Sequence, residues 1–234
     1  MTKERYFGVI GGMGSKATLE FYERLIESSK AEKDQDHMNV LILNHATLPD
    51  RTEVILGNRE NEFLDAIKKD FEILEFSKVS DIAIPCNSAH FFYDKMQKMT
   101  NINIINMIEE TMKEISKKYK AGTKIGLLAT DGTVRSGIYE KYANKHGFEI
   151  CVPEKKHQNN VMNVIYENIK GQMELDSSLL EKLIEEFIFK EKCEVVVIGC
   201  TELSCIMIRE DLKKYIYDAM DVLVNRSISI YEKY

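Results

Sequence analysis

The alternation of short apolar runs with longer amphipathic segments is the feature that most restricts the fold of this chain. The segments between the runs, such as 17–29 and 59–78, place apolar residues at helical spacing. This alternation is typical of parallel sheets covered by helices, so we predict an α/β fold. The runs rich in β-branched residues, which predict strands, are 6–11, 39–44, 81–85, 102–106, 124–129, 194–199 and 221–224.

The two halves of the chain resemble each other. The stretch 8–14 is echoed at 125–133, and 81–90 is echoed at 194–203. Each half therefore contains a strand that ends in a cysteine followed by a small polar residue. We predict two similar domains, each a parallel sheet flanked by helices, with the active site in the cleft between them. We expect residues 1–115 plus 214–234 to form the first domain and residues 116–213 to form the second.

Charge and hydropathy exclude several classes of protein. The 234 residues carry a formal net charge of -6, and the basic residues are interleaved with acidic ones, so we expect no nucleic-acid partner. The N-terminus has too few apolar residues for a signal peptide, and no run is long enough to span a bilayer. We therefore expect a cytoplasmic protein without a membrane partner.

The cysteines and histidines do not form a recognisable metal or disulfide pattern. The five cysteines include no CxxC pair, and the five histidines have no metal-ligand spacing. We expect reduced thiols, no metal and no cofactor, and no lysine has a setting typical of pyridoxal phosphate. Cys151, Cys193 and Cys205 are interpreted as structural.

Cys86 and Cys200 are the candidate catalytic residues. Each follows a predicted strand, and ligands of parallel α/β sheets bind beyond the carboxyl ends of the strands. If each cysteine opens a helix, the helix dipole favours its thiolate, which is the form that accepts a proton. The alternative is that each is a small core residue, as buried cysteines often are.

A glycine-rich loop follows the first predicted strand. Residues 12–17 formally satisfy the dinucleotide-binding pattern G-x-G-x-x-A. That pattern also predicts an acidic residue at the end of the second strand, where this chain has Asn44 followed by His45. A loop whose backbone N–H groups meet a substrate carboxylate is the simpler interpretation.

Five motifs together indicate a resemblance to a known family. The chain resembles the aspartate/glutamate racemase superfamily through GGMG at 11–14, LPDRT at 48–52, PCNSAH at 85–90, DGT at 131–133 and GCTEL at 199–203. Glutamate racemases usually open with Asp-Ser-Gly and have Gly-Cys-Thr-His at the second cysteine, so the resemblance is to the aspartate racemase branch. The chain departs from the family at Ser15-Lys16, where Pro-Glu is common, and at Ser88, where Thr is common.

The resemblance implies an isomerase that racemises a small acidic amino acid without a cofactor, often as a homodimer. It assigns Cys86 and Cys200 as the paired acid and base. It also matches Arg51 to a substrate-carboxylate arginine and Lys170 to a lysine associated with the substrate. The further residues that we expect to contact the substrate are Gly12, Met13, Gly14, Asn87, Ser88, Thr133, Thr201 and Glu202.

Other functions are compatible with the same residues. Within the superfamily, the enzyme could prefer glutamate or accept a broad range of amino acids. Outside catalysis, the cleft could bind an amino acid without turnover, although that function leaves the two equivalent cysteines unexplained.

Overall fold

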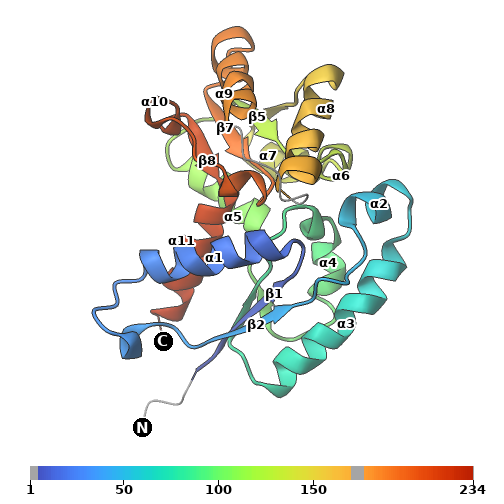
Figure 1. Ribbon diagram of the computed structural model, residues 1–234, viewed down its shortest axis with the longest axis vertical. Helices are drawn as coiled ribbons and strands as arrows, with labels where there is room; N and C mark the ends of the chain where they lie inside the picture. The colour runs from blue at the N-terminus through green and yellow to red at the C-terminus, as the bar shows by residue number, and fades with distance from the viewer. Residues whose placement is uncertain (1–4, 170–176, 234) are drawn as a thin grey trace.

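The computed structural model describes residues 5–169 and 177–233 and contains two four-stranded sheets, one in each half of the chain (Figure 1). Every strand pairing is parallel. The first sheet has the order β2-β1-β3-β4 and the second the order β6-β5-β7-β8, which is the same order within each half. The predicted α/β fold with two similar parallel sheets is confirmed. The strands are β1 (Phe7–Gly11), β2 (Val40–Asn44), β3 (Asp81–Ala83), β4 (Asn103–Ile104), β5 (Lys124–Leu128), β6 (Glu149–Cys151), β7 (Val195–Ile198) and β8 (Ile216–Asp218).

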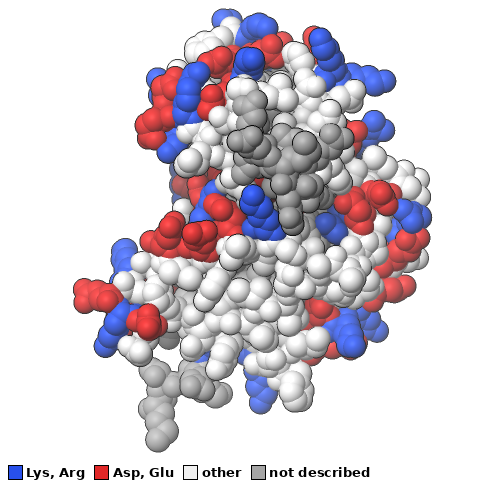
Figure 2. Space-filling view, in the orientation of Figure 1, with Lys and Arg blue, Asp and Glu red and all other residues white. Residues whose placement is uncertain are grey.

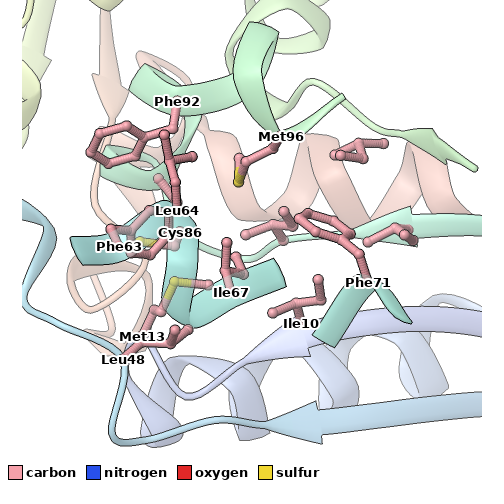
Figure 3. Close-up of a cluster of buried hydrophobic side chains, with 14 of the residues drawn as sticks. Ile10, Met13, Leu48, Phe63, Leu64, Ile67, Phe71, Cys86, Phe92 and Met96 are labelled. Carbon is pink, nitrogen blue, oxygen red and sulfur yellow. The ribbon is translucent and has the colours of Figure 1, made fainter. Parts of the chain in front are cut away.

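Helices cover both faces of the first sheet, because its central strands alternate apolar side chains between the two faces. Phe7 and Val9 of β1 pack with α1 (Ser15–Ser28) and α11 (Ala219–Tyr231). Ile10 packs on the other face with α3 (Glu60–Phe76) (Figure 3). Short helices complete this half: α2 (Arg51–Leu56), α4 (Tyr93–Met96) and the 3₁₀ turns η1 (Asp34–Asp36) and η2 (Ser88–Phe92).

The second sheet is covered in the same way. Val195 and Val197 of β7 face α5 (Met107–Ser116) and α7 (Ile138–Ala143). Val196 and Ile198 face the opposite layer, built by α8 (Lys155–Asn163) and α9 (Ser178–Glu185). The remaining elements are α6 (Asp131–Arg135), α10 (Glu210–Lys213), the 3₁₀ turns η3 (Asn144–His146) and η6 (Leu203–Cys205), and the π-helical segments η4 (Val164–Ile169) and η5 (Glu186–Lys190).

The last predicted strand is wrong. Residues 221–224 lie inside α11, whose buried residues Met220, Leu223, Ser227 and Ile230 recur at helical spacing. The strand in this region is β8, which precedes the helix and ends at Asp218. The Asp218 carboxylate accepts a hydrogen bond from the backbone N–H of Met220 at 2.9 Å, so it caps the helix and marks where it begins.

The chain crosses between the two sheets twice. Ile108, Met112 and Ile115 of α5 pack against the second sheet, and β8 pairs with β7 of that sheet. By contrast, α11 returns to the first sheet and lies beside α1 (Figure 1). The crossings therefore lie near residues 106 and 218 instead of 115 and 214. We propose that residues 107–218 form the second domain.

Charged side chains are spread unevenly over the face in Figure 2. Basic and acidic residues alternate over the second domain, whereas a broad part of the first domain is uncharged. Helix α1 contributes Leu19, Tyr22 and Ile26 as exposed apolar side chains. Among the described residues, no helix is both long and apolar enough to cross a lipid bilayer.

Gly12 and Gly122 have similar φ angles, so a comparison of the two tests whether the loop after β1 restricts the fold. Gly12 has φ +85° and lies so close to the chain after β2 that a Cβ atom would fall 2.4 Å from the carbonyl carbon of His45. Gly122 has φ +90°, and a Cβ atom there would meet nothing within 4 Å. Of these two glycines, it is Gly12 that combines the left-handed conformation with a close backbone approach.

We predict that Gly122→Ala lowers the free energy of unfolding by about 1–2 kcal/mol, since only the left-handed strain acts there. Gly12→Ala should cost about 1–3 kcal/mol more, because the two backbone segments must also move apart. Urea unfolding of both variants measures the difference. Equal losses would show that the close approach at Gly12 does not restrict the fold.

Candidate active site

The carboxyl ends of the central strands of both sheets lead into one small pocket between the domains. Eight of the residues that the sequence indicated line it, and four further residues join them. Gly12, Gly14 and Thr133 lie outside the lining, and Lys170 falls outside the described residues. The lining consists of Met13, Asp50, Arg51, Thr52, Cys86, Asn87, Ser88, Thr130, Tyr166, Cys200, Thr201 and Glu202.

The two candidate cysteines enter this pocket from different domains. Cys86 follows β3 and Cys200 follows β7, and each residue is 5% exposed. Cys86 lies at the same end of the apolar cluster of the first domain as Met13 (Figure 3). The Sγ atom of Cys200 donates a hydrogen bond to Oε2 of Glu202 at 3.1 Å. The two thiols thus line one pocket, and each comes from a different domain.

Neither cysteine opens a long helix. Cys86 precedes η2, which has five residues and continues directly into the four-residue α4, whereas Cys200 precedes η6, which has three. A helix dipole builds up over several aligned peptide units, so the short turn after Cys200 supplies little of the thiolate stabilisation that we expected. Hydrogen bonds and neighbouring charges are the remaining influences on the Cys200 thiol.

The other three cysteines, Cys151, Cys193 and Cys205, do not line this pocket. Burial, reinforced by the neighbouring Cys151, raises the pKa of the Cys193 thiol well above its usual range. Burial is also the main cause that raises the pKa of Cys205 to about 12, with further contributions from Glu20 and Glu202. Cys193 and Cys205 are therefore neutral at physiological pH, in agreement with a structural role.

Arg51 is a buried cation at the start of α2. Its Nη1 atom donates to the backbone oxygens of Leu48 and Pro49 at 3.3 and 2.8 Å, and its Nη2 atom donates to that of Met13 at 3.1 Å. Its Nε atom is buried without a hydrogen-bond partner, and no ion pair joins it to a carboxylate of residues 5–169 or 177–233. A buried charge in this state favours an incoming anion, because the anion would replace the lost solvation.

Asn87 offers a second donor. The hydroxyl of Tyr139, on α7 of the other domain, donates to Oδ1 of Asn87 at 2.6 Å. This bond fixes which way the amide points, and it leaves Nδ2 buried without a partner. Tyr139 is fully buried, and its own pKa is raised well above its usual value mainly by burial, so its hydroxyl stays protonated and able to donate. No local sequence pattern marks Tyr139, because its neighbours form an ordinary amphipathic helix.

Several of the residues that we expect to contact the substrate also form hydrogen bonds between the two domains. Oγ of Ser88 lies 3.1 Å from Oγ1 of Thr130 and 2.8 Å from Oγ1 of Thr133. Oγ1 of Thr201 donates to the backbone oxygen of Pro85 at 3.1 Å. Thr133 is completely buried and is linked to the pocket lining through Ser88 and Thr130.

The glycine loop is also hydrogen-bonded within the protein. The backbone N–H of Gly12 donates to Oγ1 of Thr18 at 3.0 Å, and that of Gly14 donates to Oε1 of Glu202 at 3.1 Å. These two N–H groups are therefore engaged, whereas we expected loop amides to meet a substrate carboxylate. Met13, between them, is the residue of the loop that lines the pocket.

A further bond between the domains was not indicated by the sequence. The hydroxyl of Tyr166, in η4, donates to the two carboxylate oxygens of Asp50 at 3.2 and 3.1 Å. Asp50 also caps α2 by accepting from the N–H of Glu53. Tyr166 thus connects the second domain to the turn that carries Arg51.

The His90 side chain forms a hydrogen bond with the backbone of Cys86. It is fully buried, and its Nε2 atom accepts from the backbone N–H of Met107 at 3.1 Å. Its Nδ1 atom, 2.9 Å from the backbone oxygen of Cys86, therefore carries the proton and donates. Burial is the main cause that lowers the pKa of His90 below its ordinary value of 6.5.

Comparisons with known proteins identify the family of this chain. Residues 10–226 match the family described as Asp/Glu/Hydantoin racemase. The chain is 28% identical to the broad specificity amino-acid racemase RacX of Bacillus subtilis, over 97% of this chain and 98% of that protein. The structure of Picrophilus torridus aspartate racemase is similar, with a TM-score of 0.83, 28% identity, and coverage of 97% of this chain and 94% of that one.

A glutamate racemase from Francisella tularensis, solved in complex with D-glutamate, has the same fold. Its TM-score is 0.66 at 17% identity, and the match covers 98% of this chain and 82% of that one. The family match and the similarity to known racemases make this chain an isomerase of the amino-acid racemase class. The chain belongs to the Asp/Glu/Hydantoin racemase family.

We predict that Tyr139→Phe lowers racemase activity by up to about 10²-fold, because the Asn87 amide loses the bond that orients it. Stability should also fall, by about 1–3 kcal/mol for the unsatisfied Oδ1. The matched control is Tyr142→Phe, on the same helix, whose hydroxyl accepts from Nδ2 of Asn106 at 2.6 Å outside the pocket. That variant should lose stability but keep its activity, and equal activity losses would contradict the assigned role of Tyr139.

His90 should make stability depend on pH. The unfolded chain binds a proton at the ordinary pKa of 6.5, whereas the native histidine does so only at lower pH. The free energy of unfolding should therefore fall as pH decreases below about 6.5, with a limiting slope of about 1.4 kcal/mol per pH unit. His90→Asn, which keeps a donor near the backbone oxygen of Cys86, should remove this contribution. Parallel wild-type and variant curves from urea unfolding between neutral and acidic pH would contradict it.

Proposed function

We propose that this protein racemises aspartate by moving the α-proton between Cys86 and Cys200, without a cofactor. The observation that carries the proposal is the pairing of two buried thiols, one from each domain, around a pocket that also contains the buried cation Arg51. One thiolate removes the α-proton, and the opposite thiol donates a proton to the other face of the planar carbanion. The α-carbon is inverted, and the roles of the two sulfur atoms are exchanged.

The pocket also has groups suited to the charge that develops during this reaction. Removal of the α-proton shifts negative charge onto the α-carboxylate of the substrate. Arg51 supplies a fixed positive charge there, and Nδ2 of Asn87 supplies a buried donor that has no other partner. Donors that are already oriented stabilise such charge without the cost of reorganising solvent.

Fewer groups in the pocket can recognise the side chain of the substrate than can bind its α-carboxylate. The described part of the pocket contains one cation, Arg51, and two carboxylates, Asp50 and Glu202. An acidic substrate has a second carboxylate, and Lys170 is our proposed partner for it. A broad-specificity racemase is the second candidate, because the described lining offers no second cation and the relative from Bacillus subtilis bears that name.

We also propose that the protein is a cytoplasmic homodimer. The apolar side chains that α1 exposes, Leu19, Tyr22 and Ile26, are suited to an interface with a second copy. Light scattering on the purified protein measures the oligomeric state directly.

The proposed mechanism predicts that Cys86→Ala and Cys200→Ala each reduce racemisation by about 10²–10⁴-fold, the usual contribution of a positioned acid or base. The assay incubates the protein with L-aspartate in deuterated water and follows both D-aspartate and α-deuterium. Wild type should show inversion with deuterium incorporation, and a variant that keeps one base can still exchange one face. Cys151→Ala, which alters a thiol outside the pocket, is the matched control and should retain full activity.

The outcome of the same assay with other substrates separates the alternatives. Turnover of glutamate and neutral amino acids at rates similar to aspartate would favour broad specificity. Full activity in either cysteine variant would contradict the two-base mechanism. No turnover of any amino acid, combined with a melting temperature raised by one of them, would favour a binding protein.

A further inference from the structure

Glu202 connects the second cysteine to the glycine loop of the other domain. Glu202 is 4% exposed, and both oxygens of its carboxylate accept hydrogen bonds. Oε2 accepts from the Cys200 thiol at 3.1 Å, and Oε1 accepts from the backbone N–H of Gly14 at 3.1 Å. The bond from Gly14 favours the ionised carboxylate, because an amide N–H stabilises negative charge on its acceptor. Glu202 is therefore fixed in position as an acceptor for the proton of Cys200.

Two negative charges at this separation repel each other strongly in a buried site, so the state that carries both is high in energy. If Cys200 were a thiolate beside the Glu202 carboxylate, the sulfur and oxygen would repel each other at 3.1 Å with little water to screen them. In the resting enzyme the pair therefore retains one proton, and because a carboxyl group is ordinarily more acidic than a thiol, that proton stays on sulfur, which donates to oxygen.

Other charged or titratable groups also face this thiol. Tyr139 interacts electrostatically with Cys200 and stays neutral, since its pKa is raised. The remaining ones in the pocket lining are Asp50, Arg51, Cys86 and Tyr166. Arg51 is the one cation among them, and it is anchored to backbone oxygens that include that of Met13 on the glycine loop. Of these groups, Glu202 is the carboxylate that accepts directly from Cys200.

We propose that Glu202 is a positioning residue that holds Cys200 as the thiol in the resting enzyme, so that Cys86 is the resting base. This inference rests on the proposed two-cysteine reaction and assigns its starting protonation. The Cys86 thiolate takes the α-proton, and the Cys200 thiol gives its proton to the opposite face. The enzyme is left with a Cys86 thiol and a Cys200 thiolate. Transfer of one proton from Cys86 to Cys200 through solvent after product release restores the resting form, with no net change in protons.

This asymmetry cannot favour one enantiomer at equilibrium. The equilibrium constant of a racemisation is one, so kcat/KM must be the same in both directions for wild type and for every variant. The two cysteines should therefore differ in the pH at which they ionise, and kcat and KM taken separately should differ between the enantiomers.

The test is the pH dependence of alkylation by iodoacetamide, read for each cysteine from the masses of its peptides. In wild type, Cys86 should ionise at lower pH than Cys200. Glu202→Gln should lower the midpoint of Cys200 by at least about one pH unit, which is about tenfold more thiolate below the midpoint. The same substitution should leave Cys86 nearly unchanged, and Cys151 serves as the internal reference. Glu210→Gln, at an exposed carboxylate that pairs with Lys213, is the matched control and should shift none of them.

Three results would overturn the proposal. They are an upward or absent shift of Cys200 in Glu202→Gln, an equal shift of both cysteines, and a wild-type Cys200 that ionises before Cys86. The comparison of the pH at which Cys86 and Cys200 ionise in wild type needs no variant, so it tests the proposal even if Glu202→Gln does not fold. Alkylation also needs no turnover, so failure of the racemase assay would count against the proposed function and not against this role of Glu202.

Discussion

Polar hydrogen bonds across the boundary between the domains are the constraint on which the pocket depends. The hydroxyl of Tyr139 orients Asn87, that of Thr201 meets the backbone of Pro85, and the carboxylate of Glu202 binds the glycine loop. Each of these bonds joins a residue beside one cysteine to the domain of the other. The relative position of the two thiols is thus set by directional contacts, which specify geometry more narrowly than apolar packing does.

These bonds also explain why so many buried polar groups are tolerated at one place. Ser88, Thr130 and Thr133 satisfy one another, whereas Nε of Arg51 and Nδ2 of Asn87 stay without partners. Leaving a buried donor unpaired is costly, and such groups concentrate where a ligand supplies the missing acceptor. The unsatisfied atoms of this pocket are donors, which suits an anionic substrate.

The sequence predicted the fold and eight of the residues that line the pocket, and the reasons why it did not predict the rest are physical. Strands buried on both faces leave continuous apolar runs, so the central strands were recognisable, whereas β8 is three residues long and borders a more hydrophobic helix. Motifs marked Arg51, Cys86 and Cys200 because their chemistry is local to short segments. Tyr139, Tyr166 and the role of Glu202 depend on contacts between distant segments, which no local pattern encodes.

The path of the chain has a consequence for biosynthesis. One face of the first sheet is covered by α1 and α11 together, so the burial of Phe7, Val9 and Phe21 is completed when α11, the last helix of the described chain, packs on them. The elements of the second sheet and its helices lie between the two crossings, so that domain is synthesised without interruption and can assemble earlier. During translation, part of this apolar face of the first domain therefore stays exposed to solvent and to chaperones until α11 has left the ribosome.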